Sequence, residues 1–212
     1  MHIPDGFLST GTWVSTWLIS IGGISYCLKK TTQILKDRMI PLMGVMSAFI
    51  FAGQMLNFPV IGGTSGHLLG GVLASVLLGP YAAAVVLTCV LTVQCLIFQD
   101  GGLTALGANI LNMSLIATIG GYFIYKAIAK IGGKKKGIIP AVFVAAWFSV
   151  VLSAISCAIE LAISGTSPLK IVLAVMAGVH ALIGIGEGII TSLVIGFVQK
   201  VRPDLIYTLE KN

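Results

Sequence analysis

Apolar residues gather in seven stretches along the chain, and polar or glycine-rich segments separate these stretches. Apolar runs of about 17 to 25 residues have the length that a helix needs to cross a hydrocarbon layer of roughly 30 Å. The pattern therefore predicts an all-α, polytopic transmembrane bundle of seven helices that forms a single membrane domain over residues 1–212. The expected helices cover residues 9–28, 39–56, 67–79, 81–98, 104–128, 138–163 and 168–199, and Pro80 separates the short third helix from the fourth.

Composition supports a membrane protein. Hydrophobic residues make up 57% of the chain and charged residues only 9%, with a mean hydropathy of +1.02, whereas about a quarter of the residues in soluble domains are charged. The chain begins with neither a positively charged segment nor a small-residue cleavage site, so we expect its first residues to be retained. The cysteines lack a CxxC spacing, so we expect buried apolar side chains at Cys27, Cys89, Cys95 and Cys157.

The basic residues predict how the bundle is oriented. If the N-terminus lies outside, every lysine and arginine except Lys170 falls in a segment on the inner side. Positive residues favour the cytoplasmic side of a membrane, so we expect an external N-terminus, a cytoplasmic C-terminus and an odd number of spans. The run "KIGGKKKG" at residues 130–137 is then a cytoplasmic loop, and binding to lipid or nucleic acid is the weaker interpretation.

The first residues of the chain, "MHIPDGFLS", suggest metal chemistry. A free amine on Met1, the backbone nitrogen of His2 and the His2 imidazole can close two fused chelate rings on one ion. An α-amino group has a pKa of about 7.7 to 8.0, so it gives up its proton to a metal more readily than a lysine does. Such chelation favours a flat four-nitrogen arrangement, which suits Ni(II) or Cu(II) better than zinc, calcium or magnesium.

A fourth nitrogen is expected from His67. The predicted topology brings the N-terminus, the loop from Asn57 to His67 and the loop near Asp100 to the same outer side. The glycine-rich stretch "GGTSG" precedes His67 and allows a close approach of backbone. Taken alone, His2 could have no role and His67 could be a hydrogen-bonded helix start, but their shared outward position favours metal ligands.

Four blocks of the sequence together resemble the NikM/CbiM family. They are "MHIPDGFLS" at residue 1, "GTSGHLLGG" around His67, "LTVQCLIFQDGGLTALGANILNM" and "GVHALIGIGEGIIT". Proteins of this family are the substrate-specific (S) membrane components of energy-coupling factor (ECF) nickel and cobalt transporters. The resemblance implies a six-helix S-component core with one extra N-terminal helix, and metal binding by Met1, His2 and His67. The "PDG" after Ile3 is more similar to the nickel branch than to the cobalt branch, which more often has "MEG" there.

The resemblance also implies partners and a location. It predicts a prokaryotic, multi-pass protein of the inner (plasma) membrane that works with a transmembrane coupling subunit and two cytoplasmic ATPase subunits. An additional small membrane subunit is a further candidate partner. The sequence has no G-x-x-x-x-G-K-[ST] loop, so we expect ATP hydrolysis to come from those partners. Ni(II) or Co(II) would be the transported ion, and no cofactor or nucleic acid is expected. Residues 1–8 would form the metal-binding segment ahead of the first helix.

Several further polar residues are candidates for supporting roles, because ionisable groups at bilayer depth are costly. Asp5 could accept backbone N–H bonds, orient the His2 ring or belong to a Pro-Asp-Gly turn. His180 and Glu187 share one helical face, where they could form a packing network or a release path. Residues that could seal the pocket are Gln94, Asp100, Asn109 and Glu160. Small residues at Gly44, Ala48 and Ala52 could pack within the bundle, and by resemblance Ala48 and Ala52 could contact the coupling subunit.

Three alternative functions remain open at this stage. The chain could be a cobalt-specific subunit that serves cobalamin biosynthesis. It could be a self-sufficient metal permease, although no inverted repeat or chain of charged residues through the membrane is evident. Residues Gly63 to Gly66 also fit the GxSG pattern of rhomboid-type intramembrane proteases, with Ser65 as nucleophile and His180 as base. The last interpretation leaves the N-terminal histidine unexplained, and we do not expect an enzyme.

Overall fold

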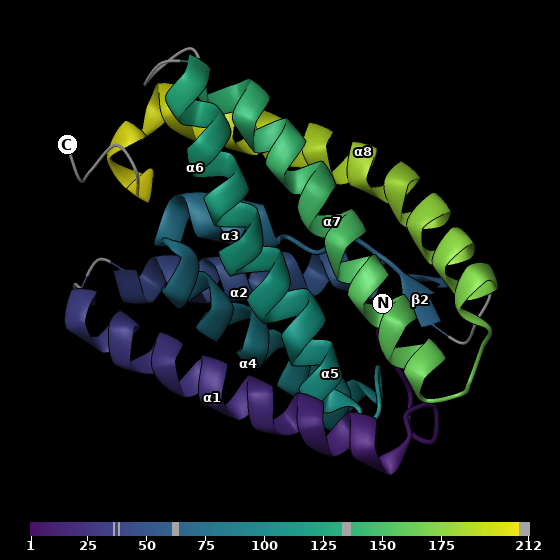
Figure 1. The fold of residues 1–212 in the computed structure, drawn as a ribbon. Coiled ribbons are helices and arrows are strands. Elements are labelled where there is room, and N and C mark those ends of the chain that lie inside the picture. Colours follow the sequence, from purple (N-terminus) through teal and green to yellow (C-terminus); the bar gives the residue numbers. More distant parts are fainter. Residues whose placement is uncertain (36, 38, 61–63, 133–136, 208–212) are drawn as a thin grey trace.

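A computed structural model describes the whole chain except residues 36, 38, 61–63, 133–136 and 208–212. It is mostly helical, and the described residues form seven helical segments (Figure 1). One of these is α5 (Leu106–Ile110), which runs through the π-helix η1 (Leu111–Gly120) into α6 (Gly121–Gly132). The others are α1 (Thr10–Ile34), α2 (Met39–Met55), α3 (Gly71–Leu78), α4 (Pro80–Phe98), α7 (Ile138–Ile163) and α8 (Leu169–Val201), with a 3-10 turn at Pro203–Leu205.

Each expected helix has a counterpart, but the segments are not alike. Within the described residues, four helices are long and apolar enough to cross a membrane: α4, Leu106–Ile131, α7 and α8. The second helix, α2, is apolar but has only 17 residues. The third, α3, has only 8 residues and rises about 12 Å at 1.5 Å per residue, so α3 alone cannot cross a bilayer.

The third segment crosses the bundle in mixed structure, which differs from the expected helix over 67–79. A two-stranded antiparallel ribbon of β1 (Phe58–Val60) and β2 (Thr64–Gly66) comes first, with Pro59 opposite Ser65. Residues 67–70 have no regular secondary structure, and α3 follows. Gly70 has a φ of 75°, a conformation that glycine adopts without strain. This stretch begins where Asn57 contacts Asp100 and ends where Gly79 lies against the Tyr207 ring.

The two ends of the bundle have different chemistry. The start of the chain and the ribbon lie towards one end, and α1, α6 and α8 all finish at the other (Figure 1). Described basic residues near those three helix ends are Lys29, Lys30, Lys126, Lys130, Lys200 and Arg202. Lys170 instead lies at the first turn of α8, at the opposite end. Lys36, Arg38, Lys211 and the lysines at the centre of the "KIGGKKKG" run fall outside the described residues.

The outer surface of the helices is rich in exposed apolar side chains. Ile97 on α4 is 70% exposed, and Leu182 and Leu193 on α8 are 72% and 69% exposed. Such extended apolar surface is unfavourable in water and suits a hydrocarbon environment. Cys27, Cys95 and Cys157 are buried as expected, but Cys89 is exposed on α4, so the expectation of a buried thiol was wrong at that position.

Candidate metal centre

The N-terminal segment passes into the bundle instead of covering it. Met1 and Ile3 are both fully buried. The amide of Asn109 holds the Ile3 backbone on both sides, because its Oδ1 accepts from the Ile3 nitrogen at 2.9 Å and its Nδ2 donates to the Ile3 oxygen at 3.2 Å. The Gly102 nitrogen also donates to the Ile3 oxygen, at 2.9 Å. Both backbone polar groups of the buried Ile3 are therefore hydrogen-bonded inside the bundle.

Asp5 secures the point where this segment leaves the interior. Its carboxylate accepts from the backbone nitrogens of Leu103 at 3.1 Å and Thr104 at 2.8 Å, and from the Thr104 hydroxyl. The Thr104 hydroxyl is the main cause that lowers the pKa of Asp5 below its ordinary value, since hydrogen bonds to the charged form favour it. Of the roles expected for Asp5, the structure shows acceptance of backbone N–H bonds.

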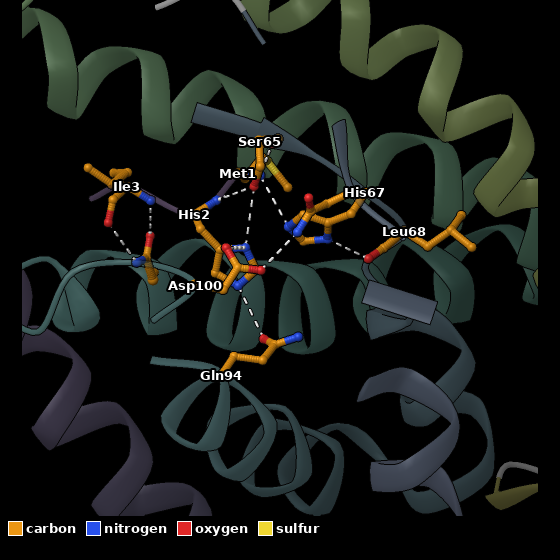
Figure 2. Close-up of polar contacts among 10 residues, drawn as sticks. Met1, His2, Ile3, Ser65, His67, Leu68, Gln94 and Asp100 are labelled. Carbon is orange, nitrogen blue, oxygen red and sulfur yellow. Dashed lines mark hydrogen bonds and ion pairs between the residues drawn. The ribbon is translucent and has the colours of Figure 1, made fainter. Parts of the chain in front are cut away.

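Three of the expected ligands meet at the inner end of the segment (Figure 2). The Met1 nitrogen lies 3.1 Å from His67 Nε2 and also contacts the Ser65 carbonyl oxygen. The ring centroids of His2 and His67 are 4.6 Å apart. His2 and His67 are 4% and 2% exposed. The amine and both imidazoles thus share a small enclosed space, although 65 residues separate the two histidines along the chain.

Hydrogen bonds to the far side of each ring leave the inner nitrogens free to bind an ion. His67 Nδ1 lies 2.7 Å from the Leu68 carbonyl oxygen, which can only accept a hydrogen, so the proton is on Nδ1 and Nε2 keeps its lone pair. His2 Nε2 lies 3.2 Å from Gln94 Oε1, so His2 Nδ1 faces the interior in the same way. Nδ1 is the nitrogen of His2 that can close a chelate ring with its own backbone nitrogen.

Burial keeps these groups neutral. Desolvation lowers the pKa of the Met1 amine from 8.0 to about 5 and that of His2 from 6.5 to about 3, and it lowers the pKa of His67 well below 6.5. The cause is that the charged form of each base loses its hydration inside the protein. Near pH 7 all three are unprotonated, which is the form that binds a metal ion.

Asp100 supplies negative charge next to these neutral bases. Its Oδ1 lies 3.2 Å from His2 Nδ1, and Asn57 holds its other oxygen at 3.0 Å. A lone pair that faces a carboxylate is repelled by it, and a cation between the two would relieve this repulsion. Within the described part of the chain, no group of three or more His, Cys, Asp or Glu side chains could hold a metal ion.

Helix α8 holds the segment that carries His67. The carboxylate of Glu187 accepts from the backbone nitrogens of Leu69 at 2.8 Å and Gly70 at 2.7 Å. His180 is fully buried and its Nδ1 lies 2.8 Å from the Met176 carbonyl oxygen. Its Nε2 has no hydrogen-bond partner among the described residues. Glu187 therefore holds the backbone that follows His67, and His180 lies close to the Met1 amine and the Ser65 backbone.

On the sequence-based prediction that His67 is a ligand of Ni(II), we expect Glu187→Gln to weaken nickel binding about 10-fold, the lower end of what loss of an outer partner of a metal ligand costs. A glutamine keeps one acceptor oxygen, so one of the two backbone N–H groups of Leu69 and Gly70 loses its partner and His67 is held less firmly. Titration of the detergent-purified chain with Ni(II) would measure the change. Ser192→Ala is the matched control on the same helix, because the Ser192 hydroxyl has no hydrogen-bond partner in the described region. Equal affinities in both variants would contradict the positioning role.

Other expected residues lie away from the centre. Glu160 accepts from Asn112 Nδ2 at 2.7 Å and lines a groove of about 570 Å³ between α1 and α7. Ala48 and Ala52 are exposed on α2, and a Cβ added at Gly44 would meet nothing within 4 Å. These three small residues therefore do not pack against another helix of the described chain, which leaves their partner role as a prediction.

Ser65 is the residue whose place sequence reasoning missed. The GxSG interpretation paired it with His180, but its hydroxyl contacts Met1 and His2 instead. No hydrogen bond joins the Ser65 hydroxyl to His180 in the described structure, and Gly63 of that motif lies outside the described residues. The sequence contained a signal for the place of Ser65, because side chains two residues apart in an extended chain point to the same side. Ser65 and His67 have that spacing.

The chain is similar to known metal transport proteins. A family model described as "Cobalt uptake substrate-specific transmembrane region" matches residues 2–205. The chain is 43% identical over 208 residues to a putative fused nickel transport protein, NikMN, of Archaeoglobus fulgidus, and the match covers 97% of this chain and 68% of that protein. It is 31% identical over 224 residues to the cobalt transport protein CbiM of Acetoanaerobium sticklandii, covering 100% of this chain and 90% of that protein.

A solved structure has the same fold. The crystal structure of a transition metal transporter matches with a TM-score of 0.89 and 33% sequence identity, covering 100% of this chain and 97% of that one.

Proposed function

Because this chain belongs to the family of cobalt uptake substrate-specific transmembrane regions, we propose that it is the ion-capturing membrane subunit of an ECF-type nickel or cobalt importer. Its relatives are nickel and cobalt transport proteins, not enzymes. With that family and four helices of sufficient length, it is a multi-pass membrane protein. The observation that carries the proposal is the convergence of the Met1 amine and the unprotonated faces of His2 and His67 in one buried space.

The proposed ligands are four nitrogens: the Met1 amine, the backbone nitrogen of His2, His2 Nδ1 and His67 Nε2. The first three close fused chelate rings through covalent links, so their spacing needs little organisation by the fold. Loss of the His2 amide proton gives one negative charge, and Asp100 beside His2 Nδ1 gives a second. Together they neutralise a divalent ion, which makes burial of the ion much less costly.

A four-nitrogen set of this kind favours Ni(II), with Co(II) as the alternative ion. Flat coordination by nitrogen is typical of Ni(II) and Cu(II), and selectivity follows geometry more than raw affinity. The "PDG" after Ile3 also favours nickel. A cobalt-specific subunit would use the same pocket with an additional ligand above the plane.

We propose that the end of the bundle that carries Met1, His2 and His67 faces outward. The end where α1, α6 and α8 finish would face the cytoplasm, because most of the lysine and arginine residues lie there. The ion enters from outside, sheds water as the nitrogens close around it, and is covered by the ribbon and the loop near Asp100. Movement of the bundle, driven by two ATPase subunits through a membrane coupling subunit, then presents the site inward. The exposed stripe at Ala48 and Ala52 suits close approach by a helix of that coupling subunit.

Titration of the purified chain with Ni(II) tests the ligand set. We expect one ion per chain, a yellow diamagnetic species, and release of about one proton per ion at pH 6.5. The reason is that the lowered pKa of Met1, about 5, leaves its amine unprotonated at that pH, so only the His2 amide gives up a proton. An exposed amine with a pKa near 8 would release a second proton.

The same pKa values set the pH dependence of nickel affinity. With one proton released, the apparent affinity should fall about tenfold per pH unit from pH 8 to pH 6, and more steeply below about pH 5, where the amine also becomes protonated. Mg(II) and Ca(II) are the control ions, since neither accepts a flat set of nitrogen ligands. A pale green paramagnetic nickel complex with no proton release would contradict the proposed ligands.

A further inference from the structure

Ser65 occupies a special position relative to the converging nitrogens. It is the middle residue of β2, and its hydroxyl points towards the N-terminal segment (Figure 2). The Ser65 Oγ atom lies 3.2 Å from the Met1 nitrogen, 3.3 Å from the His2 backbone nitrogen and 3.4 Å from His2 Nδ1. These are the three nitrogens that one ion would hold in fused chelate rings.

These three distances are nearly equal. A point equidistant from three atoms lies on the line that runs perpendicular to their plane through the centre of the circle joining them. An ion bonded equally to the three nitrogens would lie on the same line. An ion held by these nitrogens would therefore have the Ser65 hydroxyl close to the axis of its coordination plane.

The height above the plane follows from ordinary bond lengths. With metal–nitrogen bonds of about 2.0 Å, an oxygen roughly 3.3 Å from each nitrogen is about 2.6 Å from the ion. That separation is too long for an in-plane ligand and short enough for a weak axial contact. A strictly flat ion leaves the oxygen unbonded, whereas an ion that prefers more ligands can draw it closer.

The hydroxyl is also oriented for this role. In the structure its oxygen accepts from the Met1 amine and from the His2 backbone N–H. Binding of an ion replaces the His2 amide hydrogen and turns the amine lone pair towards the metal. The lone pair of the Ser65 hydroxyl oxygen that accepted hydrogen bonds from Met1 and His2 is then directed at the ion.

We propose that the Ser65 hydroxyl is the axial, specificity-determining group of the metal centre, which admits Co(II) beside Ni(II) by offering a fifth ligand. This inference rests on the proposed function. A flat Ni(II) complex gains little from the axial oxygen, whereas Co(II), which accepts more ligands, depends on it. Ser65 thus sets the ratio of the two affinities and contributes little to nickel binding itself.

Ser65→Ala tests the assignment. We expect it to weaken Co(II) binding about 10- to 100-fold and Ni(II) binding less than about threefold, with the visible spectrum of bound Co(II) shifting to that of a complex with one ligand fewer. Ser65→Thr keeps the hydroxyl and should keep the wild-type ratio of affinities. Thr64→Val is the matched control for damage to the ribbon, because the Thr64 hydroxyl bonds Met176 Sδ instead of facing the nitrogens.

The outcomes separate this inference from the proposed function. One outcome is that wild type binds both ions and Ser65→Ala weakens the binding of both equally, or weakens the binding of neither. The axial role is then wrong, and Ser65 at most holds the N-terminus in place. If Thr64→Val changes the affinity ratio as strongly as Ser65→Ala, the ratio reflects ribbon geometry and the assignment also fails. A wild-type chain that retains neither ion would overturn the proposed function, and the Ser65 assignment with it.

Discussion

One extra glycine ahead of Met1 is expected to abolish nickel retention, with the apparent affinity falling at least about 1,000-fold. The added residue converts the Met1 amine into a peptide nitrogen and moves the free amine one residue farther from His2. The new amine has no room beside His67, because Met1 is 0% exposed and its nitrogen contacts Ser65 and His67. Equilibrium dialysis with Ni(II) at pH 6.5 would measure the effect, whereas colour would not, because an undocked Gly-Met-His terminus can itself form a yellow four-nitrogen nickel complex at higher pH.

Two controls isolate the role of the amine. The same glycine added after Asn212 should leave the affinity unchanged, because the C-terminal end of α8 lies at the opposite end of the bundle (Figure 1). Acetylation of the Met1 amine adds fewer atoms than a residue and should cause the same loss. Wild-type nickel affinity in the acetylated chain would show that His2 binds through its ring alone and would refute the proposed ligand set.

Replacing Gly102 with alanine is expected to weaken nickel binding about 100-fold, the upper range for loss of an outer support of a metal site. A Cβ at this position would come within 2.2 Å of the Asp5 backbone nitrogen and 2.4 Å of Asp5 Oδ1. Backbone cannot yield as a flexible side chain does. The N-terminal segment must therefore shift, and the bond from the Gly102 nitrogen to the Ile3 oxygen is lost with it.

The matched control for this substitution is Gly22→Ala on α1. A Cβ at Gly22 would meet nothing within 4 Å, and alanine is favoured over glycine in a helix by roughly 1 kcal/mol, so nickel affinity should be unchanged. Circular dichroism should show the same helix content in both variants, because Gly102 lies in a loop outside the helices. Gly102→Ala with wild-type affinity would mean that docking of the segment does not depend on this contact.

The sequence predicted much of the helical architecture because the hydrocarbon layer imposes simple rules on length and polarity. Apolar runs separated by polar segments gave all seven helical segments, and Pro80 marked the break between α3 and α4. The local chelating group was also readable, because covalent links alone set the distances from the Met1 amine through the His2 backbone to the ring. His67 could be proposed as a metal ligand only through the predicted topology and the family resemblance.

The tertiary structure decided the parts that depend on which surfaces pack together. The third segment forms a ribbon, an irregular stretch and the short α3, and the backbone nitrogens of Leu69 and Gly70 in that stretch bond Glu187 instead of forming helical bonds. The tertiary structure also decided which nitrogens of His2 and His67 keep a free lone pair, because this depends on the contacts of the two rings with Gln94 and with the Leu68 carbonyl oxygen.

Residue pattern alone predicted that this protein crosses a membrane and that Met1 and His2 can chelate a metal ion, since both predictions follow from local composition and covalent geometry. Only the fold decided that Ser65 lies close to the axis of the proposed ion, that Asp100 faces His2 Nδ1, and that Ala48 and Ala52 are exposed. These features depend on distances between residues far apart in the chain, and such distances are set by packing of the whole bundle.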